Sequence, residues 1–513
     1  MRKRRLELMI WAFLLSLAFY PGIFGFLAWL SLVRPMLIIA KLKGRSAFNA
    51  AYFFSLFFNL FSLYWVAMVT PPGMIAAIMI VAFYYTAIFM IFHRLYHIRP
   101  FLAFVAMPFL WVGMEYFRTL TEFAFPWSDL GYTQSHFLYI LQIVSVFSVH
   151  GLSFLIVTVN VLLCQLLRGS VSPERKITSS FVSLAIIGGL VAYGWIVMPP
   201  YPVPGTVNVA LLQGSVPLEV KWAKGNAEHS YHLYDSLVQA VDDSTIDLYI
   251  WPETSAPAYL SHDSFARKRV GDIVRASSAP HLIGALSATR VGGKHRYHNS
   301  CYQFDLSGQI VHRHDKLKLV PFSEHVPYQD YLPFLEKGAL RKYLTFIDNW
   351  GVRWWSDFYP GDSATLFELD SLLYGALICF ECTFPEFVRQ SILDGADFMV
   401  GITNDTWFGR SVGIHQHSSI FITRAVENRC WMARTANSGL TYIVDRYGRI
   451  RDQLEPYEVA TLVGRIGVLD GFSTYTRIGD IVGKFSFLLT SIIGCIFIIL
   501  CLVKKLLVRI RWL

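Results

Sequence analysis

Residues 372–403 read LLYGALICFECTFPEFVRQSILDGADFMVGIT, and this stretch contains two apolar runs separated by a more polar one. Leu373–Phe380 and Asp397–Thr403 are short, strongly apolar and bounded by turn residues, which is typical of strands covered on both faces. Phe384–Asp394 between them has the pattern of an amphipathic helix. This alternation predicts an α/β layered domain.

The same alternation extends over residues 203–480, whose composition is that of an ordinary soluble domain. Further strands are predicted at Val207–Gln213, Leu248–Pro252 and His281–Ala285. Hairpins are predicted at Tyr302–His312, turning at Ser307-Gly308, and at Leu440–Ile450, turning near Tyr447-Gly448. Helices are predicted over Asn226–Asp242 and Ile414–Asn428. A stretch of this size can bury a full core without disulfides.

The sequence on either side of this domain is that of a membrane protein. The 513-residue chain is 54% apolar and only 16% charged, and the deficit of charge lies in the first 200 residues and the last 30. A helix needs about 20 apolar residues to span a bilayer. Eight candidate spans result: Leu6–Tyr20, Ile23–Ala40, Ala47–Val69, Gly73–Phe92, Phe101–Phe117, Ile140–Leu167, Ser179–Met198 and Phe485–Val503. A single helix across Pro21 would reduce them to seven.

The basic residues decide between these counts. They cluster at Arg2–Arg5, Lys41–Arg45, Arg94/Arg99, Arg168–Lys176 and Lys504–Arg511. Eight spans place every cluster on one side, as the positive-inside rule requires, and seven do not. We therefore expect seven spans in residues 1–200, a catalytic domain outside the cytoplasmic membrane in 203–480, and an eighth span with a basic tail in 481–513. Both termini would be cytoplasmic. The first span lacks an A-x-A-like cleavage site near Pro21, so we expect it to be retained.

The net charge of +9 does not indicate nucleic-acid binding, because the basic residues lie beside apolar spans. Three polar residues instead suggest chemistry, because each stands at the end of a predicted strand or hairpin. Glu253 follows Tyr249–Pro252, Lys316 lies in the stretch DKLKLVPFSE (residues 315–324), and Cys379 closes its apolar run. A thiol nucleophile, a carboxylate base and an ammonium facing an oxyanion are what covalent acyl transfer needs.

Each of the three residues also has an ordinary structural interpretation when taken alone. A cysteine that ends an apolar strand is commonly a small buried hydrophobe. The acid of a Trp-Pro-Glu turn is commonly solvated, and a lysine beside a strand is commonly a surface charge. Only the set of three supports a catalytic interpretation.

The spacing of Cys379 and Cys382 also admits a zinc or redox site. Zinc requires a second ligand pair, but His415 and His417 are only two apart and Cys301 stands alone. A thioredoxin-like site requires a different, smaller βαβ context. We therefore expect no metal and no cofactor, and we expect Cys382 to remain reduced.

Several motifs occur in the order found in the nitrilase superfamily. They are Trp251-Pro252-Glu253, Lys316 followed by Leu319-Val320-Pro321-Phe322-Ser323-Glu324, Cys379-Phe380-Glu381, and Asn404-Asp405-Thr406-Trp407-Phe408-Gly409. With the spans, and with Phe125-Pro126-Trp127 before the sixth, the whole chain resembles the apolipoprotein N-acyltransferase family of the bacterial envelope. The resemblance implies an eight-helix transmembrane bundle joined to a nitrilase-like α-β-β-α sandwich.

Carried over by position, the resemblance implies that Glu253 is the general base, Lys316 stabilises the oxyanion and Cys379 is the nucleophile. Glu324 and Glu381 would orient Lys316 and the thiol, and Asn299 and Trp222 match further supporting positions of the family. Two positions depart from its pattern. Ser323 replaces a usual glycine, and Phe380 replaces a usual tyrosine whose hydroxyl would be lost from substrate contacts.

The implied reaction is ping-pong. Cys379 takes an acyl chain from a phospholipid as a thioester and passes it to the α-amino group of an apolipoprotein's diacylglyceryl-cysteine. We expect a monomer in the bacterial inner membrane, with the catalytic domain on the periplasmic side. A membrane-anchored amidase or nitrilase acting on small amides would use the same three residues. A non-enzymatic transporter or scaffold would instead require polar residues along the spans, which are poor in them.

Two further features carry expectations. The aromatic segment Tyr343–Tyr359 is predicted either to form an interfacial lid that gates lipid entry or to pack in the domain core. Glu115 lies in the fifth span, where a charge is costly and suggests function. Because Arg118 follows it, we expect Glu115 to lie near the outer end of the span and face water.

Overall fold

The computed structural model describes residues 2–223, 225–241, 244–329, 331–332, 334 and 357–510. The chain divides into two compact units. Unit 1 comprises residues 1–64, 74–196 and 480–513, and unit 2 comprises residues 65–73 and 197–479. Most of the aromatic segment, including Trp350, Trp354 and Trp355, lies outside the described residues, and so does the lid hypothesis that rests on it.

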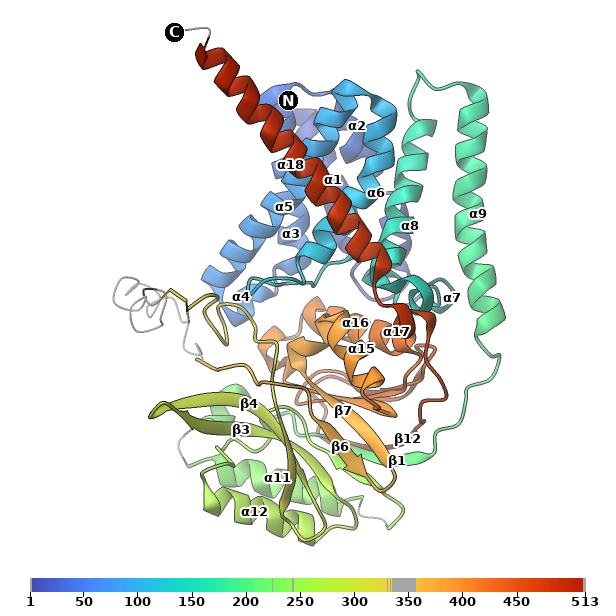
Figure 1. The fold of residues 1–513 in the computed structure, drawn as a ribbon. Helices are drawn as coiled ribbons and strands as arrows, with labels where there is room; N and C mark the ends of the chain where they lie inside the picture. The colour runs from blue at the N-terminus through green and yellow to red at the C-terminus, as the bar shows by residue number, and fades with distance from the viewer. Residues whose placement is uncertain are drawn as a thin grey trace. The chain divides into compact units, whose positions relative to one another are not determined.

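Unit 1 is helical (Figure 1). Its elements are α1 (Arg2–Leu17), η1 (Ile23–Trp29), α2 (Val33–Lys41), α3 (Gly44–Leu63), α5 (Pro71–Ile98), α6 (Pro100–Phe117), η2 (Leu130–Gln134), α7 (Leu138–Leu141), α8 (Val144–Leu166), α9 (Pro173–Val197) and α18 (Ile481–Ile510). Among the described residues, seven helical segments are long and apolar enough to cross a membrane by length and composition. The predicted multi-pass bundle is therefore confirmed as a class.

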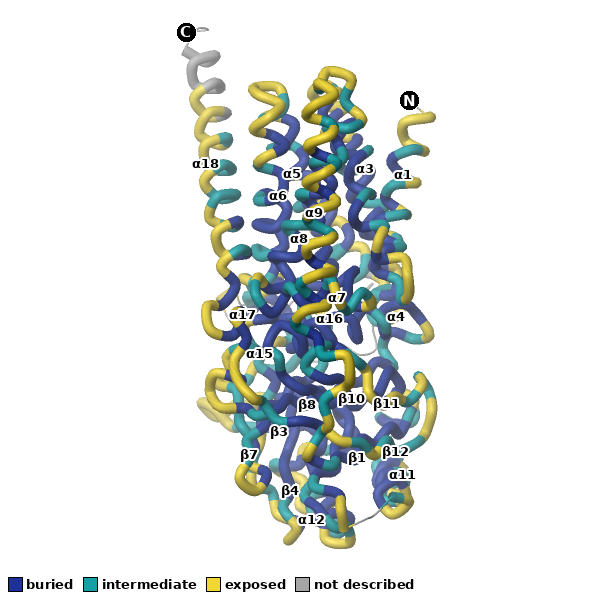
Figure 2. The backbone as a smooth tube through the Cα atoms, turned by 90° about the vertical axis from the view of Figure 1, so that its right-hand side faces the viewer, coloured by how far each residue is buried: buried dark blue, intermediate teal, exposed yellow. Residues whose placement is uncertain are grey.

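The predicted count of eight spans is approximate, because α1 has only 16 residues. The chain does break near Pro21, where α1 ends at Leu17 and a separate helical segment starts at Ile23. Within unit 1, α1 packs against α3. The start of α1 and the end of α18 lie at the same end of this unit (Figures 1 and 2).

The helices of unit 1 differ in how far they are buried. α9 and α18 are largely exposed, whereas α6 and α8 are mostly buried (Figure 2). Gly113 of α6 permits close packing with α18, because a Cβ there would lie 2.6 Å from the backbone oxygen of Ser486. Such small residues let the backbones of two helices approach where larger side chains would separate them.

The expectation that Glu115 faces water is wrong. Its side chain is fully buried near the end of α6. Its Oε1 accepts hydrogen bonds from Trp111 Nε1 at 2.8 Å and from the backbone N–H of Leu130 at 2.9 Å. The chain after α6 folds back over this carboxylate, which the position of Arg118 in the sequence does not indicate.

Unit 2 contains two six-stranded sheets within the described residues. The first has the order β12-β1-β2-β3-β4-β5 and the second β11-β10-β9-β8-β7-β6. The strands are β1 (Val207–Gln213), β2 (Leu248–Ile250), β3 (His281–Val291), β4 (Lys294–Phe304), β5 (Ile310–Asp315), β6 (Leu366–Leu369), β7 (Leu372–Ile378), β8 (Phe398–Thr403), β9 (Met432–Ala436), β10 (Thr441–Val444), β11 (Ile450–Leu454) and β12 (Ala460–Ile466). In each sheet the parallel pairs are central and the antiparallel pairs lie outside.

The remaining elements of unit 2 are helices and short turns. They are α4 (Val66–Val69), α10 (Leu218–Lys221), α11 (Ala227–Gln239), α12 (Ser264–Arg275), η4 (Cys379–Thr383), α15 (Pro385–Leu393), η5 (Asp405–Phe408), α16 (Val412–Asn428) and α17 (Thr474–Ile478).

The two sheets face each other across a common apolar core, to which Leu211 and Ile250 contribute from one sheet and Ile378 and Val400 from the other. A second core lies between the first sheet and helices α11 and α12. Helix α16 covers the second sheet so closely that a Cβ on Gly401 of β8 would lie 2.3 Å from the ring of Phe421. The layers are thus α-β-β-α, as predicted (Figure 1).

Candidate active site

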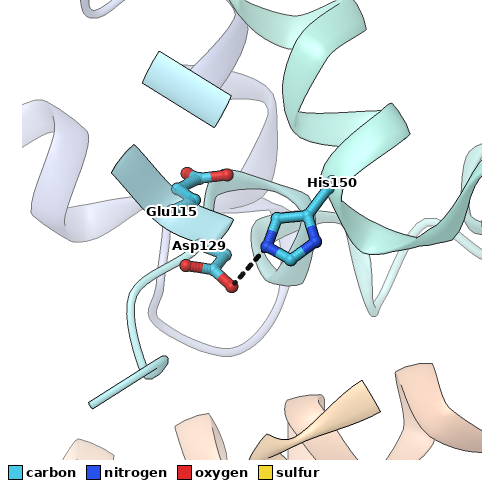
Figure 3. A group of neighbouring side chains, drawn as sticks. All are labelled: Glu115, Asp129 and His150. Carbon is cyan, nitrogen blue, oxygen red and sulfur yellow. Dashed lines mark ion pairs between the residues drawn. The ribbon is translucent and has the colours of Figure 1, made fainter. Parts of the chain in front are cut away.

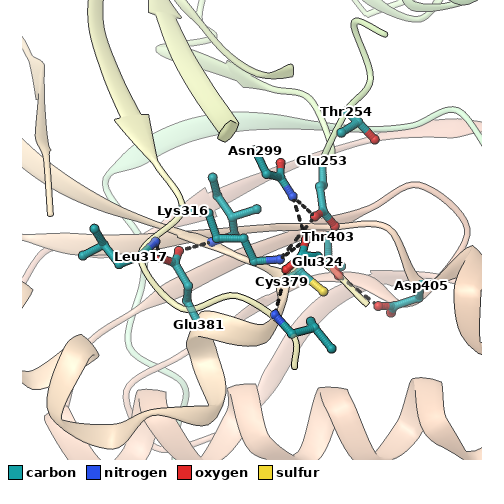
Figure 4. A network of polar contacts seen from close by, with 12 residues as sticks. Glu253, Thr254, Asn299, Lys316, Leu317, Glu324, Cys379, Glu381, Thr403 and Asp405 are labelled. Atoms are coloured by element: carbon teal, nitrogen blue, oxygen red, sulfur yellow. Dashed lines mark hydrogen bonds and ion pairs between the residues drawn. The ribbon is translucent and has the colours of Figure 1, made fainter. Parts of the chain in front are cut away.

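Glu253, Lys316 and Cys379 all lie just beyond strand ends of unit 2. Glu253 follows β2, Lys316 directly follows β5 and Cys379 directly follows β7. Cys379 has a φ of 51°, and Thr254, next to Glu253, has a φ of 50°. Non-glycine residues rarely adopt this left-handed region, and it is found where a surrounding structure holds a functional turn in place. The strand ends thus turn sharply and bring their side chains to one place (Figure 4).

Lys316 is the centre of this cluster. Its side chain is 1% exposed, and its Nζ donates a hydrogen bond to Glu324 Oε1 at 2.9 Å and lies 3.6 Å from Glu253 Oε1. Burial lowers the pKa of Lys316, but the charges of Glu324, Glu253 and Cys379 outweigh it and hold the pKa above the usual range. The ammonium therefore stays charged at neutral pH.

Asn299 joins the two carboxylates that flank Lys316. Its Nδ2 donates to Glu253 Oε1 at 2.7 Å and to Glu324 Oε1 at 3.2 Å. Glu324 Oε2 also accepts the backbone N–H of Val320 at 2.9 Å, which fixes that side chain to its own loop. Glu253 Oε2 is buried and has no hydrogen-bond partner among the described residues. One oxygen of Glu253 is thus held in position while the other is available to accept a proton.

Glu381 links the Lys316 loop to the Cys379 turn. Its side chain is fully buried. Oε1 accepts the backbone N–H of Leu317 at 2.6 Å, and Oε2 accepts the N–H of Ile378 at 2.7 Å. His314 Nε2 lies 3.3 Å from Oε2. A single carboxylate therefore fixes the backbone next to Lys316 and the backbone next to Cys379 (Figure 4).

The Cys379 thiol is partly buried. Burial and the negative charge of Glu253 raise its pKa well above the usual value, while the charge of Lys316 and the side chain of Thr403 act in the opposite direction. The thiol is therefore protonated at rest, and a nucleophilic attack by it requires a base. The electrostatic coupling of Cys379 to both Glu253 and Lys316 reflects how close the three groups lie.

A second network supports the Cys379 turn, and no role was predicted for its residues from the sequence. Asp405 is fully buried. It accepts hydrogen bonds from Thr403 Oγ1 at 3.0 Å and Arg434 Nη2 at 2.6 Å, and His417 Nδ1 lies 3.0 Å away. His417 Nε2 lies 3.2 Å from the carbonyl oxygen of Cys379. Asp405 is the second residue after the buried strand β8, much as Cys379 is the first after β7, and that signal was available in the sequence.

His417 is held in its charged form by this network. Burial lowers the pKa of His417, but Cys382 and the Asp405 carboxylate outweigh it and raise the pKa to about 9. Burial likewise raises the pKa of Asp405, but Arg434 and His417 hold it below the usual range. The imidazolium can then donate to Asp405 and to the Cys379 carbonyl at once.

Lys221 is another buried cation near Glu253, and it was not predicted from the sequence as a site residue. Its Nζ lies 3.3 Å from Thr254 Oγ1 and 3.5 Å from the Glu253 carbonyl oxygen. Burial lowers its pKa to about 8, against an opposing effect of Glu253. Trp222, the next residue, is partly exposed at the end of α10, and the described hydrogen bonds do not join its side chain to the cluster.

Gly284 of β3 explains how the Glu253 turn can approach its neighbouring strand. A Cβ at this position would lie 2.3 Å from the carbonyl oxygen of Pro252 and 2.7 Å from the Cα of Glu253. Both atoms are backbone, so the clash has no inexpensive relief. A side chain here would therefore displace Glu253.

The two departures from the family pattern have structural counterparts. Phe380 is buried, with its ring 5.4 Å from that of Phe384 in an edge-to-face arrangement. Ser323 lies in a turn closed by a bridge between Pro321 and His325.

Cys382 is buried, and both it and Cys379 are free thiols. Among the described residues, the group of two carboxylates and one histidine that could hold a metal ion belongs to unit 1.

Two family models match the chain. The apolipoprotein N-acyltransferase N-terminal domain matches residues 11–162, and the carbon-nitrogen hydrolase model matches residues 208–467. An apolipoprotein N-acyltransferase of Geobacter metallireducens is 32% identical over 91% of this chain and 90% of its own length. The chain belongs to the apolipoprotein N-acyltransferase family. The resemblance stated from the motifs is thereby confirmed.

A second curated relative has the same description as the first. An apolipoprotein N-acyltransferase of Chlorobaculum tepidum is 29% identical over 89% of each chain. Among solved structures, an amidase from Nesterenkonia sp. is similar at 17% identity and a TM-score of 0.37, covering 55% of this chain and 95% of its own. The members of this family are membrane-embedded acyltransferases within the carbon-nitrogen hydrolase superfamily.

Proposed function

We propose that this protein transfers a fatty acyl chain from a phospholipid to the α-amino group of a diacylglyceryl-cysteine apolipoprotein, through a thioester on Cys379. The observation that carries the proposal is the arrangement of Glu253, Lys316 and Cys379 around one point in a chain of this family. A protonated thiol, a base with an available oxygen and a fixed ammonium are the parts that the first half-reaction requires.

In the first half-reaction, the Cys379 sulfur attacks the ester carbonyl carbon and its proton passes to Glu253. The carbonyl oxygen becomes an oxyanion, which the Lys316 ammonium stabilises. When this intermediate collapses, the ester C–O bond breaks and the lysophospholipid oxygen takes the proton back from Glu253. The acyl chain remains on Cys379 as a thioester.

In the second half-reaction, the neutral amine of the acceptor attacks the thioester carbon and gives a proton to Glu253. The C–S bond then breaks, and the Cys379 sulfur recovers that proton. Glu253 thus serves as base and acid in both halves, which fits a carboxylate with one oxygen held by Asn299 and one available. Glu324, Asn299 and Glu381 act by position, since they hold these groups and the turns that carry them.

A membrane-anchored amidase acting on small amides would use the same three residues, so the site alone does not separate the two functions. The bundle of apolar helices and the named relatives favour the transferase. In the amidase, water takes the place of the amine acceptor.

The two functions differ in what discharges the thioester. The purified protein is incubated with labelled phospholipid and either a diacylglyceryl-cysteine peptide with a free amine or the same peptide with an acetylated amine. The proposal predicts label on the free-amine peptide alone. Release of free fatty acid at the same rate with both peptides would show a hydrolase and contradict the proposal.

We also propose that unit 2 lies on the periplasmic side of the inner membrane and that both termini are cytoplasmic. The basic clusters beside the spans support this orientation, as does the position of the first and last helices' ends at one end of unit 1. A fluorescent protein that fluoresces only in the cytoplasm, fused to the C-terminus, should be fluorescent. Fluorescence loss with gain of periplasmic alkaline phosphatase activity at the same fusion point would contradict the orientation.

A further inference from the structure

Unit 1 contains a buried cluster of ionisable side chains that the acyl transfer reaction does not use (Figure 3). It consists of Glu115 near the end of α6, Asp129 just before η2 and His150 in the first half of α8. All three side chains are at most 1% exposed. One ligand atom from each lies within 4.8 Å of the other two.

The cluster has one atom on each residue that is buried and lacks a hydrogen-bond partner among the described residues. These atoms are Glu115 Oε2, Asp129 Oδ2 and His150 Nε2. His150 Nε2 lies 3.6 Å from Asp129 Oδ2. Buried carboxylate and imidazole atoms are seldom left without a partner, because their desolvation costs several kcal/mol. Because one ligand atom of each residue lies within 4.8 Å of those of the other two, a single ion between the side chains would contact all three residues.

Asp480, just before α18, orients the histidine. Its Oδ2 pairs with His150 Nδ1, and its Oδ1 accepts hydrogen bonds from Ser148 Oγ and the backbone N–H of Gly483, each at 2.8 Å. When Nδ1 donates its proton to Asp480, Nε2 presents a lone pair toward the two carboxylates. A carboxylate that fixes a histidine tautomer in this way is the usual partner of a metal-bound histidine.

The net charge of the buried cluster also favours a bound cation. Within the described part of the chain, the charged groups at the cluster are the carboxylates of Glu115, Asp129 and Asp480 and the guanidinium of Arg118, whose Nη2 lies 2.5 Å from Asp129 Oδ1. With His150 neutral, three carboxylates face one guanidinium, which leaves two uncompensated negative charges in a buried place. Such charges require compensation. A divalent cation supplies it in full, and Arg118 contacts the oxygen of Asp129 that the cation does not need.

We propose that Glu115, Asp129 and His150 bind a divalent transition-metal ion. Two ligands of one such ion lie about 3.4 Å apart at metal–ligand distances near 2.1 Å, close to the contact between His150 and Asp129. The mixed carboxylate and imidazole set suits Zn²⁺ or Mn²⁺ better than Mg²⁺, which prefers oxygen ligands and retains water. This ion replaces the expectation of a metal-free protein drawn from the sequence.

The ion would have a structural role, because its ligands come from separate elements of unit 1. It would join the end of α6 to the segment before η2 and to α8, next to the place where Ser148 has a φ of 63° and interrupts the helix. Through Asp480 it would also hold the start of α18. The proposal is independent of the acyl transfer chemistry and concerns the stability of the helical unit.

The alternative is that protons neutralise the cluster, on His150 and on Glu115. Metal analysis of the full-length protein separates the two cases. The protein is purified in detergent without a histidine tag, stripped with a chelator, dialysed against Zn²⁺, Mn²⁺ or Mg²⁺, and measured by elemental mass spectrometry. We expect about one Zn²⁺ or Mn²⁺ per chain, and a higher melting temperature that chelation reverses.

Three variants and a control locate the ion. Glu115→Gln, which imitates a protonated carboxylic acid, and His150→Gln should lose the metal and its effect on the melting temperature. Asp480→Asn keeps all three ligands and should bind the ion at least about tenfold more weakly. Glu7→Gln removes a partly exposed carboxylate of the same unit and should bind the ion as the unmodified protein does.

Metal bound equally by His150→Gln and the unmodified protein would mean that the ion lies elsewhere and would overturn the proposal. Less than about 0.1 equivalent of Zn²⁺ and Mn²⁺ on the unmodified protein would also overturn it. That second measurement needs no variant, so it holds even where a substitution prevents folding.

Discussion

The link that Glu381 makes between the Lys316 loop and the Cys379 turn can be tested with Glu381→Gln. The substitution keeps the shape of the side chain but replaces one carboxylate oxygen by an NH₂ group. Both oxygens accept backbone N–H groups, from Leu317 at 2.6 Å and Ile378 at 2.7 Å. Whichever way the amide turns, one buried N–H then faces another donor.

A hydrogen bond to a charged group is worth about 1.5–3 kcal/mol, and a buried donor left unsatisfied costs a similar amount. If that loss is expressed in the transition state of acylation, the rate of thioester formation falls about 10- to 150-fold. The substitution should lower the acylation rate at saturating lipid rather than raise the lipid concentration that gives half of that rate. The reason is that Glu381 positions the reacting groups and is buried away from solvent.

The assay follows single-turnover acylation of the purified protein by a fluorescent phospholipid. Glu386→Gln is the matched control, because that side chain is 54% exposed and contacts Arg389 on the surface. The melting temperature of each variant separates a local effect from unfolding. Acylation by Glu381→Gln within about twofold of the unmodified rate would refute the reasoning, since it corresponds to less than about 0.5 kcal/mol.

Three further predictions follow from the site. Lys316→Gln should slow thioester formation by about 10²–10³-fold, as removal of an oxyanion donor does. Lys318→Gln, which changes an exposed side chain two residues later, should leave the rate unchanged. Equal rates of the two variants would mean that Lys316 has no part in the mechanism. Gly284→Ala should lower the free energy of unfolding by about 1–3 kcal/mol, because the added Cβ meets backbone atoms at the Glu253 turn. The control Gly188→Ala in α9 adds a Cβ that meets nothing within 4 Å and should be neutral or stabilising in a thermal melt. Similar melting temperatures of the two variants would argue against the close contact at Gly284. The pKa of His417 is raised to about 9 in the folded protein, so its contribution to stability is complete below its unfolded pKa of 6.5 and is lost as the pH rises through 9. Thermal melts between pH 6 and 10 should show this loss of stability, and His417→Gln should remove the pH dependence. An unchanged pH profile in the variant would contradict the assignment.

Much of unit 2 was predictable because its central strands are buried on both faces and so appear as continuous apolar runs. β1 has the predicted bounds, and β2, β7 and β8 differ from prediction by one or two residues at either end. Glu253 and Cys379 could be named as candidates because Glu253 is the first polar residue after one such run and Cys379 is the reactive residue at the end of another. The position of a strand end is visible in the sequence even though the sheet is not.

Other parts depend on contacts between distant residues. Arg434 lies within β9 and is buried, which the sequence gives no reason to expect. Its burial depends on partners outside β9, the carboxylate of Asp405 and the carbonyl oxygen of Leu440. β12 has a half-exposed, irregular pattern and was not predicted. It pairs with β1, which lies about 250 residues earlier, and this pairing is decided by the fold as a whole.

The same distinction explains the outcome for Glu115. Hydropathy places this residue in a span but does not say what covers it. Its burial results from the chain after α6, which returns the Leu130 N–H to its carboxylate, and from Trp111 one turn earlier. Neither contact has a signature in the residues that flank it.

The central claim is that Cys379 carries the acyl chain between donor and acceptor. Peptide mass spectrometry after incubation of the purified protein with phospholipid alone tests it most directly, with Cys382→Ser as the matched variant. We predict a hydroxylamine-sensitive acyl adduct on Cys379 in both proteins, which disappears when the free-amine lipopeptide is added. An acyl group on Cys382 instead, or continued transfer by Cys379→Ser, would contradict the account.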